Sequence, residues 1–158
     1  MQKLAILNSR EIKKIKEQVT KDFGYFPVED YAFILNENGN LFLVSKDITK
    51  INLDHLIIDR VGLYFAEVKN TQVRLSKEGA QLLAEEALKK KIKLRNQVEL
   101  TAEETKDYFQ GHDVQKDLGT ENRLILLSYN GNILGCAKYK EKTILNFLPK
   151  IHRGEVIL

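Results

Sequence analysis

The stretch RLILLSYNGNILGCAKYK, residues 123–140, contains two apolar, β-prone runs on either side of Asn130-Gly131. An Asn-Gly pair between two such runs is a strong hairpin signal, because both residues tolerate the left-handed backbone of a tight turn. The stretch therefore predicts two antiparallel strands, over 123–129 and 133–139. A further strand is predicted over 143–148, and Pro149 ends it.

The residues before this hairpin predict a short strand and a helix. Residues 98–100 are a short β-prone run, and Thr101 with Glu104 has the spacing of a capping box. The helix that starts there extends to about Phe109 and is stopped by Gly111. The C-terminal part of the chain therefore has the order strand, helix, hairpin, strand.

The first half of the chain predicts a separate unit that begins with a helix. Asn8 and Glu11 form another capping-box pattern, and Gly24 can end the helix. Its apolar residues recur at helical spacing; they are Ile12, Ile15, Val19 and Phe23.

Strands and a second helix follow in this half. Asn38-Gly39 joins apolar runs at 31–35 and 41–45, a short helix or turn is predicted over 49–56, and two more runs occupy 61–68 and 72–75. Ser76 can cap a helix that extends to about Lys91. The predicted elements are least continuous near residues 92–97, between the basic end of the second helix and the strand that follows. We therefore predict an α/β domain over 1–94 and a second domain over 95–158.

Composition indicates a globular protein. The chain has 158 residues, 43% of them hydrophobic and 30% charged, with a net charge of +3. Cys136 is the one cysteine, so an internal disulfide is impossible. No signal peptide is recognisable and no apolar run approaches the ~20 residues that span a bilayer. We therefore expect a cytoplasmic protein without a membrane partner.

No catalytic, metal or cofactor site is predicted. None of the three histidines has a second histidine or a cysteine at ligand spacing, and neither GxGxxG nor a P-loop occurs. Cys136 lies within a predicted strand, where a small buried side chain is the simpler interpretation. Adjacent glutamates on the helices point in different directions and do not form a catalytic pair. We expect a protein that is not an enzyme.

Two basic clusters have competing interpretations. Lys138, Lys140 and Lys142 would alternate onto one face if their strand extends that far, and three ammonium groups on one face suit a phosphate backbone. A solvated surface explains them equally well. The run over 89–95 is interpreted as compensation of the helix dipole together with a solvated face.

The order of the C-terminal segments resembles a PUA domain, the module named after pseudouridine synthases and archaeosine transglycosylases. The segments are QVELTAEETKDYFQGHDV (97–114), the hairpin at 123–140 with its Leu134-Gly135 step, and LNFLPKIHR (145–153). The C-terminal motif Leu148-Pro149-Lys150 is similar to the motif that ends PUA domains related to Nol/Nop/Sun-type RNA cytosine-5 methyltransferases.

The N-terminal half extends this resemblance. Residues 62–83 (GLYFAEVKNTQVRLSKEGAQLL) resemble the pre-PUA region of archaeal ribosome-biogenesis proteins, and the two-domain plan is similar to that of Nip-type assembly factors. The resemblance implies an α+β fold, in which an α/β pre-PUA domain precedes a PUA-like mixed β-barrel, closed or nearly closed. The methylase motifs of the related enzymes are not recognisable, so we expect the RNA-binding appendage.

The resemblance also implies where RNA would bind. The groove beside the first PUA helix would contribute Gly111, His112, Asp113 and Val114. Basic residues would lie nearby, in the hairpin and at the C-terminus; they are Lys138, Lys140, Lys142, Lys150 and Arg153.

The expected partner is rRNA or tRNA, in ribosome biogenesis or RNA modification, with an RNA methyltransferase or a pre-ribosomal particle as a protein partner. The alternative is a scaffold that docks such a partner without touching RNA. Residues 96–158 favour this alternative, because they hold 8 Lys and Arg against 9 Asp and Glu.

Overall fold

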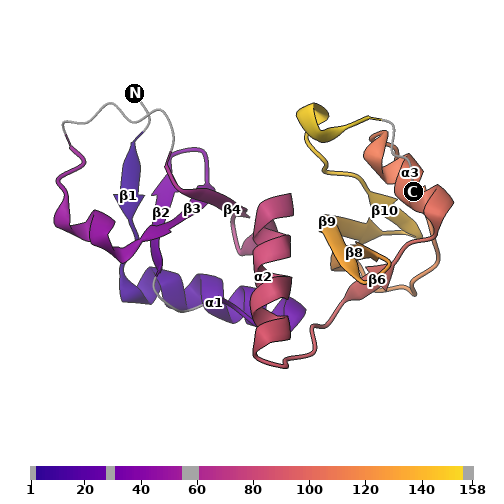
Figure 1. The fold of residues 1–158 in the computed structure, drawn as a ribbon, viewed down its shortest axis with the longest axis horizontal. Coiled ribbons are helices and arrows are strands. Elements are labelled where there is room, and N and C mark those ends of the chain that lie inside the picture. Colours follow the sequence, from indigo (N-terminus) through magenta and orange to yellow (C-terminus); the bar gives the residue numbers. More distant parts are fainter. Residues whose placement is uncertain (1–2, 28–30, 55–60, 155–158) are drawn as a thin grey trace.

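The computed structural model describes residues 3–27, 31–54 and 61–154, which form two five-stranded sheets and three α-helices (Figure 1). The first sheet has the order β1-β2-β3-β4-β5 and is antiparallel throughout. Its strands are β1 (Leu4–Ile6), β2 (Tyr31–Asn36), β3 (Asn40–Ser45), β4 (Leu63–Lys69) and β5 (Gln72–Leu75). The first and second helices are α1 (Ser9–Phe23) and α2 (Lys77–Lys89).

Helix α1 forms for the reasons that the sequence indicates. The Asn8 side chain accepts hydrogen bonds from the backbone N–H groups of Arg10 and Glu11, both at 3.0 Å, and the Glu11 carboxylate accepts from Asn8 N at 2.8 Å. Gly24 ends the helix with a φ of +89°, a left-handed value that favours glycine. Ile15, Val19 and Phe23 are buried against the first sheet.

The first sheet contains the predicted hairpin and one strand that was not predicted. The Asn36 side chain accepts hydrogen bonds from Asn38 N and Asn40 N, which stabilise the turn between β2 and β3. Strand β1 pairs with β2 although only three residues take part. The short helix or turn predicted over 49–56 starts earlier, as the 3₁₀ turn η1 (Lys46–Lys50), and residues 55 and 56 lie outside the described residues.

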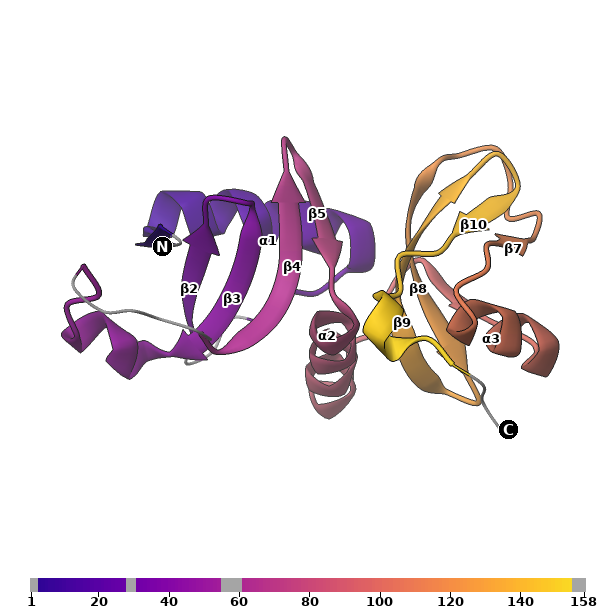
Figure 2. The same cartoon turned by 90° about the horizontal axis from the view of Figure 1, so that it is seen from above.

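The second sheet has the order β6-β8-β9-β10-β7. Its strands are β6 (Gln97–Glu99), β7 (Val114–Gln115), β8 (Arg123–Tyr129), β9 (Asn132–Lys140) and β10 (Thr143–Leu145). Strands β6 and β8 are parallel and the other pairs are antiparallel. Helix α3 (Ala102–Phe109) packs over the inner face, and the 3₁₀ turn η2 (Lys150–His152) follows the last strand (Figure 2).

This second sheet is consistent with a PUA-like fold but is more open than the predicted barrel. It curls into a half-barrel whose edges, β6 and β7, are not paired with each other among the described residues. The edge strands have three and two residues, too few to close a ring of hydrogen bonds. Strand β10 also ends at Leu145, three residues before the predicted end.

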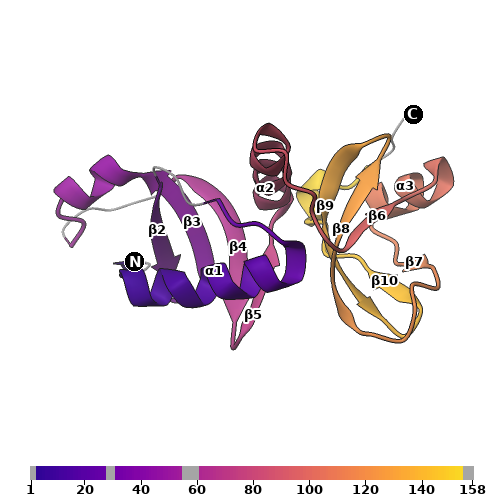
Figure 3. The ribbon, with the colours of Figure 1, turned by 90° about the horizontal axis from the view of Figure 1, so that it is seen from below.

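Helix α2 joins the two sheets. It lies between them, in contact with β4 on one side and β9 on the other (Figure 2). Figure 3 shows that α1 crosses one face of the first sheet and that the C-terminal end of α1 reaches the second sheet. One buried cluster therefore contains side chains from both halves: residues of α1, α2 and the first sheet pack with Leu124, Leu126 and Cys136.

The interior of the half-barrel is a second, smaller cluster. Its fully buried members include Tyr108 from α3, and Ile125, Leu127 and Tyr139 from the sheet. Strands β8 and β9 therefore contribute alternate residues to two cores, as expected for strands that are covered on both faces. The two halves share apolar surface instead of being joined by a free linker.

Cys136 can report on the separation of the two halves. It is 5% exposed within the shared cluster, and burial raises the pKa of its thiol to about 12. A buried, protonated thiol is a poor nucleophile. We expect an aromatic disulfide reagent at pH 8 to label Cys136 only when the halves separate or the chain unfolds, at a rate that rises steeply with urea. Rapid labelling without denaturant would contradict this packing.

Two further observations concern the described residues only. None of their helices is both long and apolar enough to cross a membrane. They contain no group of three or more His, Cys, Asp and Glu side chains arranged to hold a metal ion.

Candidate nucleic-acid interface

The end of α3 forms a tight turn around Gly111. The helix starts at the predicted capping box, in which Thr101 N donates to the Glu104 carboxylate at 2.9 Å and Glu104 N donates to Thr101 Oγ1 at 3.2 Å. Gly111 follows the helix with a φ of +89°. A Cβ atom there would lie 2.6 Å from Nε of Arg153. The left-handed backbone therefore favours glycine, and any larger residue would also displace the Arg153 side chain.

The C-terminal segment folds back onto this turn. Arg153 Nε donates a hydrogen bond to the Leu148 carbonyl at 2.9 Å, and Gly154 N donates to the Phe109 carbonyl at 2.8 Å. Arg153 is exposed, as is Lys150 in η2. The structure therefore brings Gly111, Arg153 and Lys150 to one end of the second sheet.

Asn146, which the sequence analysis did not single out, organises the loop after Gly111. Its side-chain amide donates to the carbonyls of Tyr108 at 2.7 Å and His112 at 2.8 Å, and its backbone N donates to Asp113 Oδ1 at 2.8 Å. Asp113 therefore has a structural partner. Asparagine occurs in many loops, so only the fold reveals this role.

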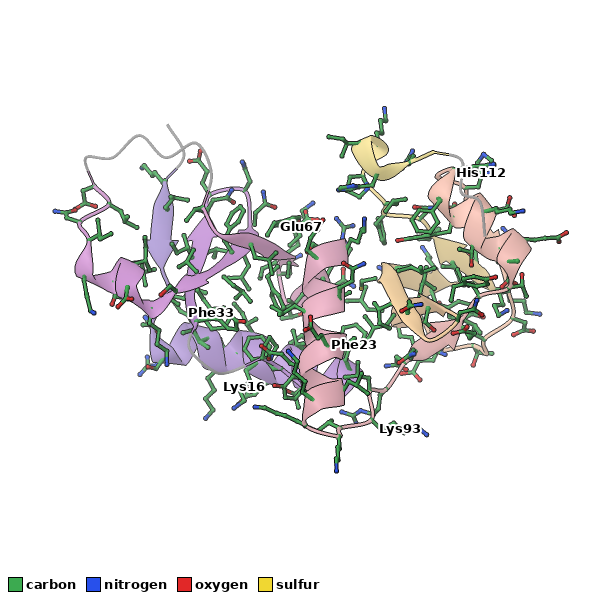
Figure 4. The ribbon with its side chains drawn as sticks, in the orientation of Figure 1. Lys16, Phe23, Phe33, Glu67, Lys93 and His112 are labelled. Atoms are coloured by element: carbon green, nitrogen blue, oxygen red, sulfur yellow. The ribbon has the colours of Figure 1, made fainter. Side chains whose placement is uncertain are left out.

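His112 and Val114 have opposite environments. The His112 imidazole is 65% exposed, 3.9 Å from the Asp107 carboxylate, and it lies at the outer edge of the domain (Figure 4). Val114 is 5% exposed and packs in the interior of the half-barrel. Of the predicted loop residues, His112 offers a side chain to a ligand, whereas the side chain of Val114 does not.

The three hairpin lysines are not equivalent. Lys138 and Lys140 occupy alternate positions of β9, as predicted, but the strand ends at Lys140. The condition for Lys142 to share this face, that the strand extends as far as Lys142, is not met: Glu141 and Lys142 form the turn to β10, with φ values of +50° and +62°. The Lys142 ammonium lies 3.5 Å from the Asp117 carboxylate. The pKa of the Asp117 carboxyl is lowered, chiefly by the hydrogen bond from the Gly119 backbone N–H and also by the positive charge of Lys142.

The sheet separates these lysines from the Gly111 loop. Leu124, which pairs with Lys138, packs in the cluster shared with the N-terminal half, whereas Ala137 and Tyr139 face α3. Lys138 and Lys140 therefore lie on the face opposite α3. The predicted residues form two groups, one around Gly111 and Arg153 and the other along β9, with Lys142 at the turn.

A pocket of about 150 Å³ lies where the C-terminal segment meets the N-terminal half. The Arg74 guanidinium stacks 4.1 Å from the centre of the Phe147 ring and also pairs with Glu67. His152 Nε2 lies 3.8 Å from the Glu78 carboxylate of α2. Sequence reasoning missed these contacts because they join residues that are far apart in the chain.

The family comparison covers the C-terminal part of the chain. Residues 95–153 match the family model described as the methyltransferase RsmF PUA domain. These residues form a PUA domain. The predicted relation to Nol/Nop/Sun-type RNA methyltransferases is thereby confirmed, and α3, the Gly111 loop, the β8–β9 hairpin and Arg153 all belong to the matched segment.

Two curated relatives extend the similarity beyond the PUA domain. The ribosomal RNA small subunit methyltransferase F of Vibrio parahaemolyticus is 27% identical over 148 residues, covering 87% of this chain and 29% of the relative. The same enzyme of Vibrio campbellii is 29% identical, covering 90% of this chain and 29% of the relative. The chain therefore spans less than a third of the length of these relatives. The similarity to archaeal proteins stays a prediction.

Proposed function

We propose that this chain binds RNA through its PUA domain and acts in rRNA modification. The observation that carries the proposal is the family match over residues 95–153, which contains the Gly111 loop with exposed His112, Lys150 and Arg153. An exposed imidazole and exposed cations in one domain suit a nucleotide, because cations contact phosphates and a ring can stack on a base.

The proposed role is binding and not catalysis. The single thiol, Cys136, is buried and its pKa is raised, which makes it unsuited to attack on a base. The first domain fits a pre-PUA role in this proposal, since its helix α2 packs on β9 and supports the PUA sheet from outside. The scaffold alternative retains one supporting observation, the near-neutral charge of residues 96–158.

Binding of a single-stranded RNA over a range of salt concentrations tests the proposal. We expect the K138A/K140A/K142A variant to bind with a salt-dependence slope lower by about 2, since each lost phosphate contact on a single strand contributes about 0.7. The loss of affinity is expected to be similar for RNAs of different sequence, because ammonium groups that contact phosphates do not distinguish between bases. His112→Ala is expected to reduce discrimination between sequences instead.

The matched control is K3A/K46A/K50A, which removes the same charge from exposed positions in the first domain. Lys138 is half-buried and the other substituted side chains are exposed. Because exposed charges contribute little to stability, all variants should stay close to the unfolding midpoint of the wild type. If the hairpin variant and an H112A/K150A variant both keep the affinity and slope of the control, the PUA surface does not bind RNA. The scaffold function would then be the better account.

A further inference from the structure

The excess positive charge of this chain lies outside the PUA domain. Residues 1–94 hold 16 Lys and Arg against 13 Asp and Glu, whereas residues 95–158 hold 9 against 9. A protein that binds a polyanion would be expected to concentrate its cations where the ligand lies. The arrangement of these N-terminal cations therefore requires an explanation.

Several of them gather along α1 and the segment that leads from α2 to β6. Lys13, Glu17 and Lys21 are four residues apart, and Lys16 is three residues from Lys13, which places these four residues along one side of the helix. With Arg95 they line an open hollow of about 390 Å³, in which Glu17 is the one acidic lining residue among those described. Lys13, Lys16, Lys21, Lys93 and Arg95 are all exposed; we call these five residues the α1–linker surface.

The linker is fixed to α1, so this surface has a defined geometry. Arg95 donates to the Thr20 carbonyl at 2.6 Å through its guanidinium and to the Phe23 carbonyl at 2.8 Å through its backbone N–H. The Asn96 side chain donates to the Asp22 carbonyl at 2.6 Å. These donors satisfy carbonyls at the end of the helix and offset the negative end of its dipole, which would otherwise repel an anion.

The same linker is also attached to the PUA sheet. The Asn96 carbonyl accepts a hydrogen bond from Leu126 N of β8 at 2.8 Å. The α1–linker surface is thus held in a fixed position relative to the PUA domain. Lys16 and Lys93 both project on the side of the molecule along which α1 runs toward the linker (Figure 4).

We propose that the α1–linker surface is a second contact for the phosphate backbone of the RNA that the PUA domain binds. The inference rests on the proposed RNA binding and adds a second segment of the same RNA. From Lys13 to Lys21 the stripe extends over about 12 Å of helix, long enough to face more than one phosphate. Among the described residues, α1 exposes no large hydrophobic side chain and the linker exposes only Ile92, at 37%, which is little apolar surface for a membrane contact and favours a soluble polyanion.

RNA length separates this contact from the PUA site. Fluorescence anisotropy of the full chain would compare oligouridylates of about 8 and about 30 nucleotides, the shorter one chosen to fit a single small binding module. We expect K13A/K16A/K21A to lower the salt slope for the long RNA by about 2, with an affinity loss of up to about 100-fold near 0.1 M salt. Binding of the short RNA should not change. K3A/K46A/K50A is the charge-matched control and should bind both RNAs like the wild type.

Two outcomes would overturn the inference. An unchanged slope for the long RNA in K13A/K16A/K21A would show that α1 does not touch it. Loss of binding to phosphatidylserine vesicles with an unchanged RNA slope would show that this surface serves a membrane instead. If the wild type failed to bind the short RNA, the proposed PUA site would fail, while a slope change on the long RNA would still support the α1–linker surface.

Discussion

Leu126→Ala is expected to lower the free energy of unfolding by about 3 kcal/mol, within the range for truncation of a buried leucine. Leu126 is fully buried and lies on the face of β8 that packs against the N-terminal half. The cavity would open within the core that both halves share, so both should lose stability together. Urea unfolding followed by circular dichroism and by Cys136 labelling should show coincident transitions.

Leu127→Ala is the matched control. Leu127 is the next residue of the same strand and equally buried, but its side chain lies in the half-barrel interior with Tyr108 and Tyr139. Its truncation should have a similar global cost. Leu126→Ala should speed labelling of Cys136 in the absence of denaturant more than Leu127→Ala does, because Cys136 lies in the same cluster as Leu126. Equal labelling rates in the two variants would contradict a shared core between the halves.

The elements that the sequence predicts well are those with local causes. The capping boxes at Asn8 and Thr101 and the turns at Asn38-Gly39 and Asn130-Gly131 depend on residues within four positions of one another. Such signals act wherever the segment lies in the fold. The order of these signals resembles that of a PUA domain, and the family match over residues 95–153 confirms the resemblance.

What the sequence did not predict depends on long-range contacts. Strand β1 has three residues and forms only because β2 offers an edge. The turn at Glu141-Lys142 contains no glycine or asparagine, so nothing local indicates that both residues take a positive φ. Which face of β9 carries Lys138 and Lys140 depends on where the N-terminal half packs, and no local pattern contains that information.

The basic run at 89–95 contains one cation whose role has a local cause and one whose role depends on a long-range contact. Lys89 pairs with Glu85 at 3.0 Å near the end of α2, where a cation also opposes the helix dipole, as interpreted from the sequence. Arg95 instead binds the end of a different helix, 75 residues earlier in the chain. Two cations of the same run therefore stabilise two different helices, and only the tertiary structure distinguishes their roles.

Gly79 presents two opposed effects whose magnitudes decide the result of a substitution. Glycine within a helix costs about 1 kcal/mol relative to alanine, so propensity alone favours Gly79→Ala. A Cβ atom at this position would overlap the Phe65 carbonyl oxygen and lie 2.9 Å from its carbon. Because backbone cannot rotate aside as a side chain can, α2 would have to move away from β4.

We expect Gly79→Ala to lower the free energy of unfolding by about 2 kcal/mol, since overpacking of a close contact exceeds the propensity gain. The Phe65 carbonyl also accepts a hydrogen bond from Ser76 N at 2.8 Å, so displacement of α2 would strain its N-cap as well. Urea unfolding provides the measurement. Ala84→Gly, on the same helix, is the control for ordinary propensity and should itself destabilise by about 1 kcal/mol. If Gly79→Ala were stabilising, α2 would not pack as closely on β4 as the structure shows, and its support of the PUA sheet would be weaker.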